Sequence, residues 1–412
     1  MNLRADAERI VREAIEQVLP DEAVARALAK REFGSGGLYV VAAGKAAWQM
    51  AKAASGILGE RIAAGIVVTK YHHVKGEIPR MRCFEAGHPV PDDNSFAATE
   101  AAMELAAGLG EGDTLLFLLS GGGSALFEKP LIPGRELADI TEELLACGAD
   151  IVEINTIRKR LSAVKGGKFA KLCEPAQVYS IVLSDILGDP LDMIASGPTV
   201  PDTSTGGQAR AVAEKYRLHL SAGAASLLDV ETPKTLDNTE TVVTGSVRDL
   251  CMAAAESCRR LDYEPVFLTD GLCCEAREAG SFLASVAKSH QDSGKSLAFL
   301  AGGETVVHLT GTGLGGRNQE LSLAAAEGIA GLADTAVFSV GSDGTDGPTD
   351  AAGGFVDGET KGKLAELGVD IYRALRENDA YHALDAVGGL LKTGATGTNV
   401  NDVAVVLIKR ES

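Results

Sequence analysis

Basic residues are scarce in this 412-residue sequence, where 39 Lys and Arg face 57 Asp and Glu and the net charge is −18. Nucleic-acid binding generally needs basic surface against the phosphates, so the composition argues against that class of partner. The seven cysteines fit no zinc-ligand spacing. Scattered thiols in a chain of this length are typical of a reduced, cytoplasmic protein.

Long apolar runs are also missing. No apolar stretch approaches the length of a membrane span. Residues 1–18 alternate charged and apolar positions like an amphipathic helix, which is unlike a signal peptide. We therefore expect a globular cytoplasmic protein with neither a membrane nor nucleic acid among its partners.

What the sequence does contain is a regular alternation of strand-like and helix-like segments. Apolar strands are predicted at residues 37–42, 65–69, 114–119 and 178–184, with helical periodicity between them. This order predicts a parallel sheet covered by helices on both faces. The length exceeds that of one ordinary core, so two domains are expected.

A second α/β unit is predicted beyond a loop at residues 197–207 that is rich in Pro, Gly, Thr and Asp. Its strands are expected at residues 241–244, 265–269, 296–301, 305–310, 336–340 and 403–408. Gly302-Gly303-Glu304 is typical of a hairpin turn, so the second sheet is expected to be mixed. We place the domains at residues 1–232 and 233–412, the last segment being a candidate to pack back toward the first.

Residues 315–320, Gly-Gly-Arg-Asn-Gln-Glu, open a predicted helix after the strand at 305–310. Unpaired N–H groups and the positive end of the helix dipole make such a place suitable for an anion. Arg317 can hold a phosphate or carboxylate through two parallel hydrogen bonds.

The same region contains a dinucleotide lookalike. Gly311, Gly313 and Gly316 match the spacing G-x-G-x-x-G, which points to a dehydrogenase. However, no acidic residue ends the next strand at the distance of ~20 residues that ribose binding requires. The match alone is weak.

Two other strand ends carry groups that suit anions. Gly44-Lys45 follows the first strand, where the lysine either meets an anion or is a surface lysine; the segment is not a P-loop. The third strand ends in a loop of three glycines between two hydroxyls, whose amides can surround an anion. Its residues are Ser120, Gly121, Gly122, Gly123 and Ser124.

A basic island lies between residues 154 and 173 and contains no acidic residue. Two interpretations stay open: it binds polyphosphate, or it is a solvated helix face that forms salt bridges. Its members are Arg158, Lys159, Arg160, Lys165, Lys168 and Lys171.

Carboxylates cluster after two further strands. Asp185 directly follows the strand at 178–184, with Asp189 close behind, and Asp343 and Asp346 lie in a Gly/Asp loop. Such groups can hold Mg²⁺ or act as a general base, although an Asp/Gly turn is the simpler explanation for the second loop. Thr396 and Asn399 belong to a polar loop before the last strand. Together, these loops contain the groups that phosphoryl transfer needs.

Six segments resemble the class II glycerate 2-kinase family, whose C-terminal part is called the MOFRL domain. They are SGGGSAL (120–126), INTIRKRLSAVKGGK (154–168), SDILGDPLDMIASGPTVPD (184–202), GGRNQELSLAAA (315–326), GSDGTDGPTDAAG (341–353) and TGATGTNVNDV (393–403). The resemblance implies ATP- and Mg²⁺-dependent phosphorylation of D-glycerate to 2-phosphoglycerate. It also implies an N-terminal Rossmann-like three-layer domain with a mostly parallel sheet and a C-terminal α/β domain with a mixed sheet.

The resemblance also implies roles for single residues. The family needs the lysine of its AAGKAA segment and the arginine of GGRNQE, which are Lys45 and Arg317 here. We expect both to neutralise the transferring phosphoryl group, with Asp185 as the base or a metal ligand. The remaining candidate metal ligands are Asp189, Asp343 and Asp346. The remaining candidate substrate or phosphate ligands are Ser120, Gly121, Gly122, Gly123, Ser124, Arg158, Lys165, Asn318, Glu320, Thr396 and Asn399.

Two other functions stay open at this point. Members of the family have also been labelled hydroxypyruvate reductases, which would use NAD(P)H. The third alternative is a non-catalytic protein that binds a sugar acid or a nucleotide. A homodimer is an additional, open expectation.

Overall fold

The computed structural model describes residues 2–29 and 31–410, which fall into two compact units. The parallel-sheet unit comprises Ala23–Ser184 and Asp189–Thr244. The mixed-sheet unit comprises Met1–Glu22, Asp185–Gly188 and Gly245–Ser412. The N-terminal helix thus belongs with the second half of the chain, and the domain division at residue 232 stays a prediction.

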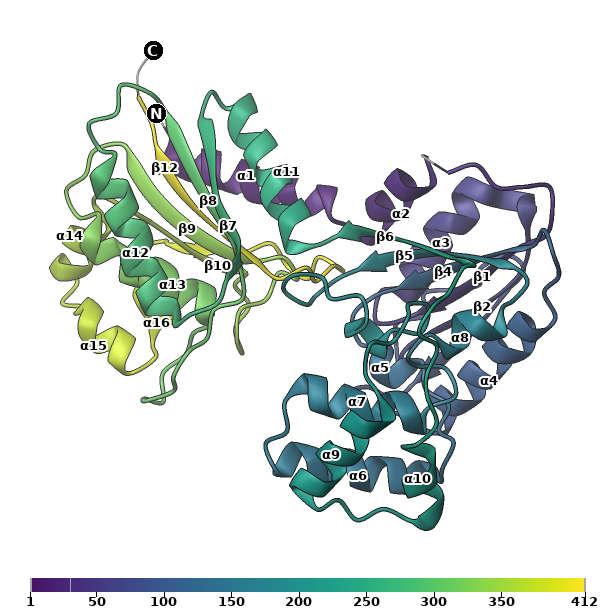
Figure 1. Ribbon diagram of the computed structural model, residues 1–412. Helices are drawn as coiled ribbons and strands as arrows, with labels where there is room; N and C mark the ends of the chain where they lie inside the picture. The colour runs from purple at the N-terminus through teal and green to yellow at the C-terminus, as the bar shows by residue number, and fades with distance from the viewer. Residues whose placement is uncertain (1, 30, 411–412) are drawn as a thin grey trace. The chain divides into compact units, whose positions relative to one another are not determined.

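Six parallel strands form the first sheet, in the order β3-β2-β1-β4-β5-β6, which confirms the predicted sheet type (Figure 1). The strands are β1 Leu38–Ala43, β2 Ile62–Lys70, β3 Met81–Ala86, β4 Thr114–Leu119, β5 Gln177–Leu183 and β6 Thr239–Gly245. The prediction that residues 241–244 start the second sheet was wrong, because β6 lies beside β5. The Pro/Gly-rich stretch at 197–207 is therefore an internal loop of the parallel-sheet unit.

Helices cover both faces of this sheet because alternate residues of its strands point to opposite sides. Val40 and Leu116 pack with Met50 of α3, whereas Phe117, the residue after Leu116, contacts Phe127 and Phe169. A separate group, α6, α7, α9 and α10, has its own small core (Figure 1). The helices are α2 Pro20–Leu28, α3 Ala47–Leu58, η1 Gly59–Arg61, α4 Asp93–Ala107, α5 Gly123–Leu126, α6 Gly134–Ala146, α7 Ile151–Leu161, α8 Lys168–Leu172, η2 Ile194–Ser196, α9 Gly206–Tyr216 and α10 Ala222–Leu227.

The second sheet is mixed, as predicted, in the order β11-β10-β9-β12-β8-β7. Its strands are β7 Glu264–Leu272, β8 Leu297–Gly303, β9 Thr335–Gly341, β10 Gly353–Asp357, β11 Leu390–Leu391 and β12 Asp402–Ile408. The mixed character comes from β12, which runs antiparallel to both β8 and β9. The predicted hairpin was wrong. Strands β7 and β12 occupy the two positions beside β8, and residues 305–310 form a loop with one isolated bridge at Val306.

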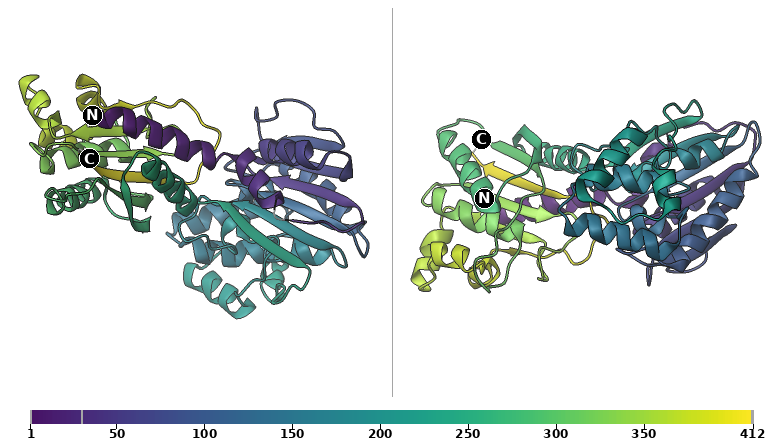
Figure 2. Two further views of the ribbon diagram at one scale, coloured as in Figure 1. Left: turned by 90° about the horizontal axis from the view of Figure 1, so that it is seen from above. Right: turned by 60° about the horizontal axis from the view of Figure 1, so that its bottom comes forward.

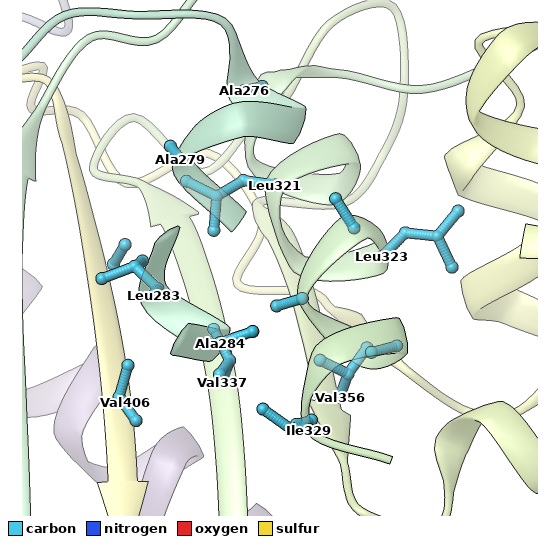
Figure 3. Close-up of a cluster of buried hydrophobic side chains, with 14 of the residues drawn as sticks. Ala276, Ala279, Leu283, Ala284, Leu321, Leu323, Ile329, Val337, Val356 and Val406 are labelled. Atoms are coloured by element: carbon cyan, nitrogen blue, oxygen red, sulfur yellow. The ribbon is translucent and has the colours of Figure 1, made fainter. Parts of the chain in front are cut away.

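Helices pack on both faces of the mixed sheet as well. On one face, α12 and α13 enclose Leu283, Leu321 and Val337 in a core that Figure 3 shows. On the other, α1 packs through Ile10 beside α11 and β12, and Figure 2 shows α1 lying along this sheet. The helices are α1 Leu3–Gln17, α11 Val247–Arg260, α12 Ala276–Ser289, α13 Arg317–Gly328, α14 Thr360–Glu366, α15 Ile371–Arg376 and α16 Ala380–Ala386. Across the described ranges, no helix is long and apolar enough to cross a membrane.

Candidate functional site

The mixed-sheet unit contains a cleft of about 820 Å³. Its walls come mainly from residues within 304–317, which follow β8, and 343–348, which follow β9. The other lining residues are Leu187, Cys273, Glu320, Asn378 and Ala380. A volume of this size accommodates a small ligand or cofactor. The cleft therefore brings the predicted Arg317 segment and the predicted Gly/Asp loop together.

The start of α13 is already occupied by an internal anion. The Asp346 carboxylate accepts hydrogen bonds from the backbone N–H groups of Asn318 at 3.1 Å and Gln319 at 2.9 Å. The same carboxylate accepts one from the Asn318 side chain, and a Cβ on Gly316 would collide with it. The expected phosphate position at this helix start is thus filled by Asp346, which satisfies the first N–H groups of α13.

Arg317 projects into the cleft from the first turn of α13 and is held by two carboxylates. Its Nε donates to Asp402 Oδ2 at 2.5 Å and its Nη2 to Asp402 Oδ1 at 3.1 Å. Its Nη1 donates to Glu304 Oε1 at 2.9 Å. A guanidinium has five N–H groups, so two remain for a ligand while the carboxylates fix its plane.

The electrostatics of this pair follow from its burial. Burial raises the pKa of Asp402 to about 6, Arg317 opposes that shift, and the nearby Asp346 charge adds to it. Burial also raises the pKa of Asp346, against the hydrogen bonds from Gln319 and Asn318. The two parallel hydrogen bonds from Arg317 favour the ionised form of the Asp402 carboxylate.

Hydrogen bonds with Asn378 hold the loop between β8 and α13. The Asn378 side chain accepts the N–H of Gly311 at 2.9 Å and donates to Glu320 Oε2 at 3.3 Å. Glu320 is buried, and burial raises its pKa. Glu320 therefore shapes this loop through Asn378.

The G-x-G-x-x-G glycines have a structural purpose here. A Cβ on Gly311 would collide with the backbone of Glu377, and a Cβ on Gly313 would collide with Glu377 and Asp379. No strand ends directly before them, since β8 ends at Gly303, and Asp346 fills the helix start that a pyrophosphate would need. The pattern therefore does not form a dinucleotide cradle.

The other predicted residues of this unit occupy the loops beyond β9 and before β12. A Cβ on Gly341 would lie 3.3 Å from a carboxylate oxygen of both Asp343 and Asp402, so these two acids lie side by side. Thr396 donates from its hydroxyl to the Ser342 carbonyl and from its N–H to the Asp343 carbonyl. The exposed Asn399 accepts the N–H of Asn401.

In the parallel-sheet unit, the ends of β1 and β4 are joined. The chain runs outward from β1 through β2 to β3 and then returns to β4 on the other side of β1, so ligands are expected between these two strand ends. The Lys45 N–H donates to the Gly121 carbonyl at 2.9 Å, and the Ala46 N–H donates to Ser120 Oγ at 3.0 Å. The structure thus brings the predicted lysine and the predicted glycine loop together.

The middle of this glycine loop is enclosed by two side chains. Gly122 has a φ of 85°, and a Cβ there would lie 3.0 Å from His88 Nε2 and 3.2 Å from Lys45 Cγ. Within residues 2–29 and 31–410, no hydrogen bond from the N–H of Gly121 or Gly122 is found. His88 was missed by the sequence analysis; its signal was the Gly87-His88-Pro89 turn after the short strand β3.

Most of the basic island forms a buried network of salt bridges, whereas Lys171 is exposed and pairs with Glu174; phosphate binding by the island stays a prediction. Lys165 is buried and donates to the Ser124 carbonyl at 2.9 Å, and Arg158 donates to the same oxygen at 3.0 Å. Both also lie within 4 Å of the buried Glu128 carboxylate. Burial lowers the pKa of Lys165 to about 8 despite Glu128. These two cations hold the glycine loop from behind.

Lys159 and Arg160 belong to a neighbouring network around Asp202. Lys159 Nζ lies 3.1 Å from Asp202 Oδ1, and Arg160 Nη1 lies 3.5 Å from Oδ2. All three side chains are buried, and Thr232 donates to the same carboxylate at 2.7 Å. This part of the island fastens α7 to the loop that follows β5.

Asp185 and Asp189 lie on the loop after β5. Residues Asp185–Gly188 cluster with the mixed-sheet unit, where Leu187 lines the cleft. Asp189 adopts a positive φ of 50°. Among the described residues, no group of three or more His, Cys, Asp or Glu side chains is arranged to hold a metal ion.

Comparison with known proteins assigns the chain. Residues 6–229 match the family described as a domain of unknown function, DUF4147, and residues 297–402 match the MOFRL family. D-glycerate 2-kinase of Thermotoga maritima is 49% identical over 413 residues, with 99% of each chain covered. The chain belongs to the glycerate 2-kinase family.

Other members of the glycerate 2-kinase family agree in sequence and in structure. Glycerate 2-kinase of Pyrococcus horikoshii is 39% identical, covering 99% of this chain and 98% of its own. The crystal structure of glycerate kinase from Thermotoga maritima has a TM-score of 0.95 at 48% identity, covering 99% and 100% of the two chains. A relative from Agrobacterium vitis, 37% identical over 418 residues, is provisionally named a hydroxypyruvate reductase.

Proposed function

We propose that this chain is a kinase that transfers a phosphoryl group from ATP to the 2-hydroxyl of D-glycerate, giving 2-phosphoglycerate. The observation that carries the proposal is the similarity, over 99% of both chains, to a protein named D-glycerate 2-kinase. The groups of the site are consistent with it, since Lys45 joins a glycine loop at the switch point and Arg317 lines a cleft.

Phosphoryl transfer is mainly positioning and neutralisation of spreading charge. In the proposal, the N–H groups of Gly121 and Gly122 bind an anionic group of a substrate, either the glycerate carboxylate or the ATP phosphates. Lys45 neutralises that group from beside the loop. Arg317 offers its two remaining N–H groups to phosphoryl oxygens, and the clamp of Asp402 and Glu304 keeps it in place before substrate arrives.

The carboxylates of the cleft fit Mg²⁺, the metal expected with ATP. Proteins bind Mg²⁺ through one or two carboxylates together with substrate phosphates, and Asp343 lines the cleft. When bound, Mg²⁺ would neutralise phosphate charge. Asp346 and Asp402 suit this role less, because both oxygens of each accept hydrogen bonds. Those of Asp346 accept from the start of α13, and those of Asp402 accept from Arg317.

Asp185 is the proposed base for the 2-hydroxyl, and Asp189 is a proposed metal ligand on the same loop. Thr396 and Asn399 are proposed to hold the loop before β12, since Thr396 bonds to Ser342 and Asp343 and Asn399 bonds to Asn401. Arg158 and Lys165 are proposed to act on phosphate through the glycine loop, because both donate to the Ser124 carbonyl.

A single assay distinguishes the candidate functions. The protein is incubated with D-glycerate, ATP and Mg²⁺, and ADP is measured together with the position of the phosphate on the product by ³¹P NMR. We expect stoichiometric ADP and 2-phosphoglycerate, and neither without glycerate. NADH or NADPH oxidation on hydroxypyruvate without ADP formation would support a reductase instead. Thermal stabilisation by ATP or glycerate without product would indicate a binding protein.

A further inference from the structure

His88 lies on the loop after β3 and reaches the glycine loop after β4. The edge of its ring faces Gly122: a Cβ there would lie 2.9 Å from His88 Cδ2 and 3.0 Å from Nε2. The same Cβ would lie 3.2 Å from Lys45 Cγ. Gly122 thus lies between an imidazole and the lysine side chain, and its missing Cβ is what lets both approach.

The turn that carries His88 is fixed by the start of α4. Asp92 caps this helix by accepting the N–H of Ser95 at 3.0 Å, and Ser95 Oγ in turn accepts the N–H of Asp92. Tyr71, which follows β2, donates to the same carboxylate at 2.6 Å. A Cβ on Gly87 would lie 2.6 Å from the Val90 carbonyl, so the turn is tight as well. These contacts fix the backbone of the turn that carries His88.

The strand-end loops around this point bring several groups to one place. His73, after β2, contacts the Lys45 carbonyl through Nδ1 at 3.1 Å, and Thr69 donates to the same oxygen. His88 is half-buried. An imidazole fixed beside loop amides and a lysine has the chemistry of an anion ligand.

We propose that His88 is a substrate ligand, which binds through Nε2 the same anionic oxygen that the glycine loop and Lys45 bind. The inference rests on the proposed kinase function and adds a residue that touches the substrate. A carboxylate and a phosphate present the same oxygen chemistry here, so the ligand class is an anionic group of D-glycerate or of ATP. Nε2 faces the glycine loop. A substituted side chain with a hydrogen-bond donor at the position of Nε2 should therefore still bind the anionic oxygen.

The test compares His88→Ala with His88→Gln, because the glutamine amide reaches the position of Nε2 whereas alanine removes the donor. Steady-state kinetics are measured while D-glycerate and ATP are varied separately. We expect His88→Ala to raise the KM of one substrate by about tenfold or more, the effect of one lost hydrogen bond to a charged group. His88→Gln should recover most of that loss. The substrate whose KM moves identifies the anion.

His219→Gln is the matched control, since that imidazole belongs to the same unit but is 93% exposed. It should leave both KM values unchanged. Wild-type KM values for both substrates in His88→Ala would overturn the inference, as would an equal loss in the Ala and Gln variants, which would indicate a steric role. If the wild type phosphorylates no glycerate, the proposed function fails. The inference is then decided by calorimetric binding of ATP and of D-glycerate to wild type and His88→Ala, and equal affinities reject it.

Discussion

At the scale of single residues, the cationic side chains of the candidate site are paired with more carboxylates than the sequence indicated. Arg317 is clamped by Asp402 and Glu304, and the start of its helix is filled by Asp346. A free arginine would be a stronger but less directed anion receptor. Clamping fixes the guanidinium plane and leaves two N–H groups for the ligand, which favours a geometry-dependent role such as stabilising a transition state.

Replacing Arg317 should therefore impair both activity and stability. Arg317→Ala leaves Asp402 buried without its partner, at a cost of about 2 kcal/mol of unfolding free energy; the value is moderate because the arginine is one-third exposed. Turnover should fall by about 100-fold or more. Adding Asp402→Asn should restore most of the stability while activity stays low. The measurements are urea unfolding and kcat for both variants.

A double variant that regains activity along with stability would show that Arg317 only supports the fold. The control is Asp402→Asn alone. It keeps the arginine and should lose less stability than Arg317→Ala, because no buried charge is left unpaired.

Asp202 should make stability sensitive to acid. Burial raises its pKa, but hydrogen bonds from Thr232 and Ser204 and the charge of Lys159 outweigh it and lower the pKa to about 2. The unfolded chain takes up this proton near pH 3.8, so the stabilisation is complete above that pH and is lost as pH falls through about 2. Its size is on the order of 2 kcal/mol.

The measurement is unfolding free energy against pH for wild type and Asp202→Asn. The difference between them should be large at pH 6 and should shrink below pH 4. Exposed Asp139→Asn serves as the control and should give a small difference at every pH. A wild-type to Asp202→Asn difference that does not change with pH would argue against the lowered pKa.

At the scale of elements, close helix packing supports the cleft. Gly280 of α12 meets α13, where a Cβ would collide with the Leu321 carbonyl and lie 3.0 Å from Ala324 Cβ. Figure 3 shows the core that these helices enclose against the strands. Because α13 carries Arg317 in its first turn, the spacing of the two helices also sets the position of the guanidinium.

Gly280→Ala should therefore destabilise the protein by about 1–3 kcal/mol, because α12 must move away from α13. Gly362→Ala in α14 is the matched control: no heavy atom lies within 4 Å of its added Cβ. Alanine should stabilise that helix by about 0.5–1 kcal/mol. Thermal melts of the two variants should shift in opposite directions, and a neutral Gly280→Ala would mean that the helices are not tightly packed.

Which elements could be predicted from the sequence depended on whether a local pattern determined them. Buried strands such as residues 114–119 and 336–340 are continuous apolar runs, and the structure confirms them. Residues 305–310 are also apolar, but whether they form a strand depends on a free sheet edge, and β7 and β12 flank β8. The sheet to which β6 belongs is likewise a tertiary property that a local pattern does not contain.

The same distinction between local pattern and tertiary contact decides which residues of the candidate site could be predicted. Glycines, hydroxyls and charges at strand ends identified Lys45, the loop 120–124 and Arg317 because strand ends are where such residues serve ligands. The partners of those residues could not be predicted, since Asp402 lies 85 residues from Arg317. His88 was overlooked because the half-buried strand β3 gives a weak pattern.

At the scale of the whole molecule, the two units have separate cores, and one tryptophan reports on only one of them. Trp48 lies in α3 of the parallel-sheet unit, whereas Ile10 of α1 is buried in the mixed-sheet unit. Ile10→Ala should lower the unfolding free energy of the mixed-sheet unit by about 2–5 kcal/mol. Circular dichroism should then show an earlier transition, while Trp48 fluorescence keeps its wild-type midpoint.

Arg12→Ala, on the exposed side of the same helix, is the control and should change stability by no more than about 0.5 kcal/mol. A Trp48 midpoint that moves together with the circular-dichroism transition in Ile10→Ala would mean that the two units unfold as one.

The placement of α1 also has a consequence for synthesis on the ribosome. Its packing partner α11 begins about 230 residues after α1 ends, and β12 comes later still. At about 5–20 residues per second, the apolar side of α1 waits at least ten seconds for α11 to be made. The parallel-sheet unit is complete during that interval. Helix α1 thus leaves the ribosome long before its packing partners exist, which makes it a natural binding segment for a chaperone during translation.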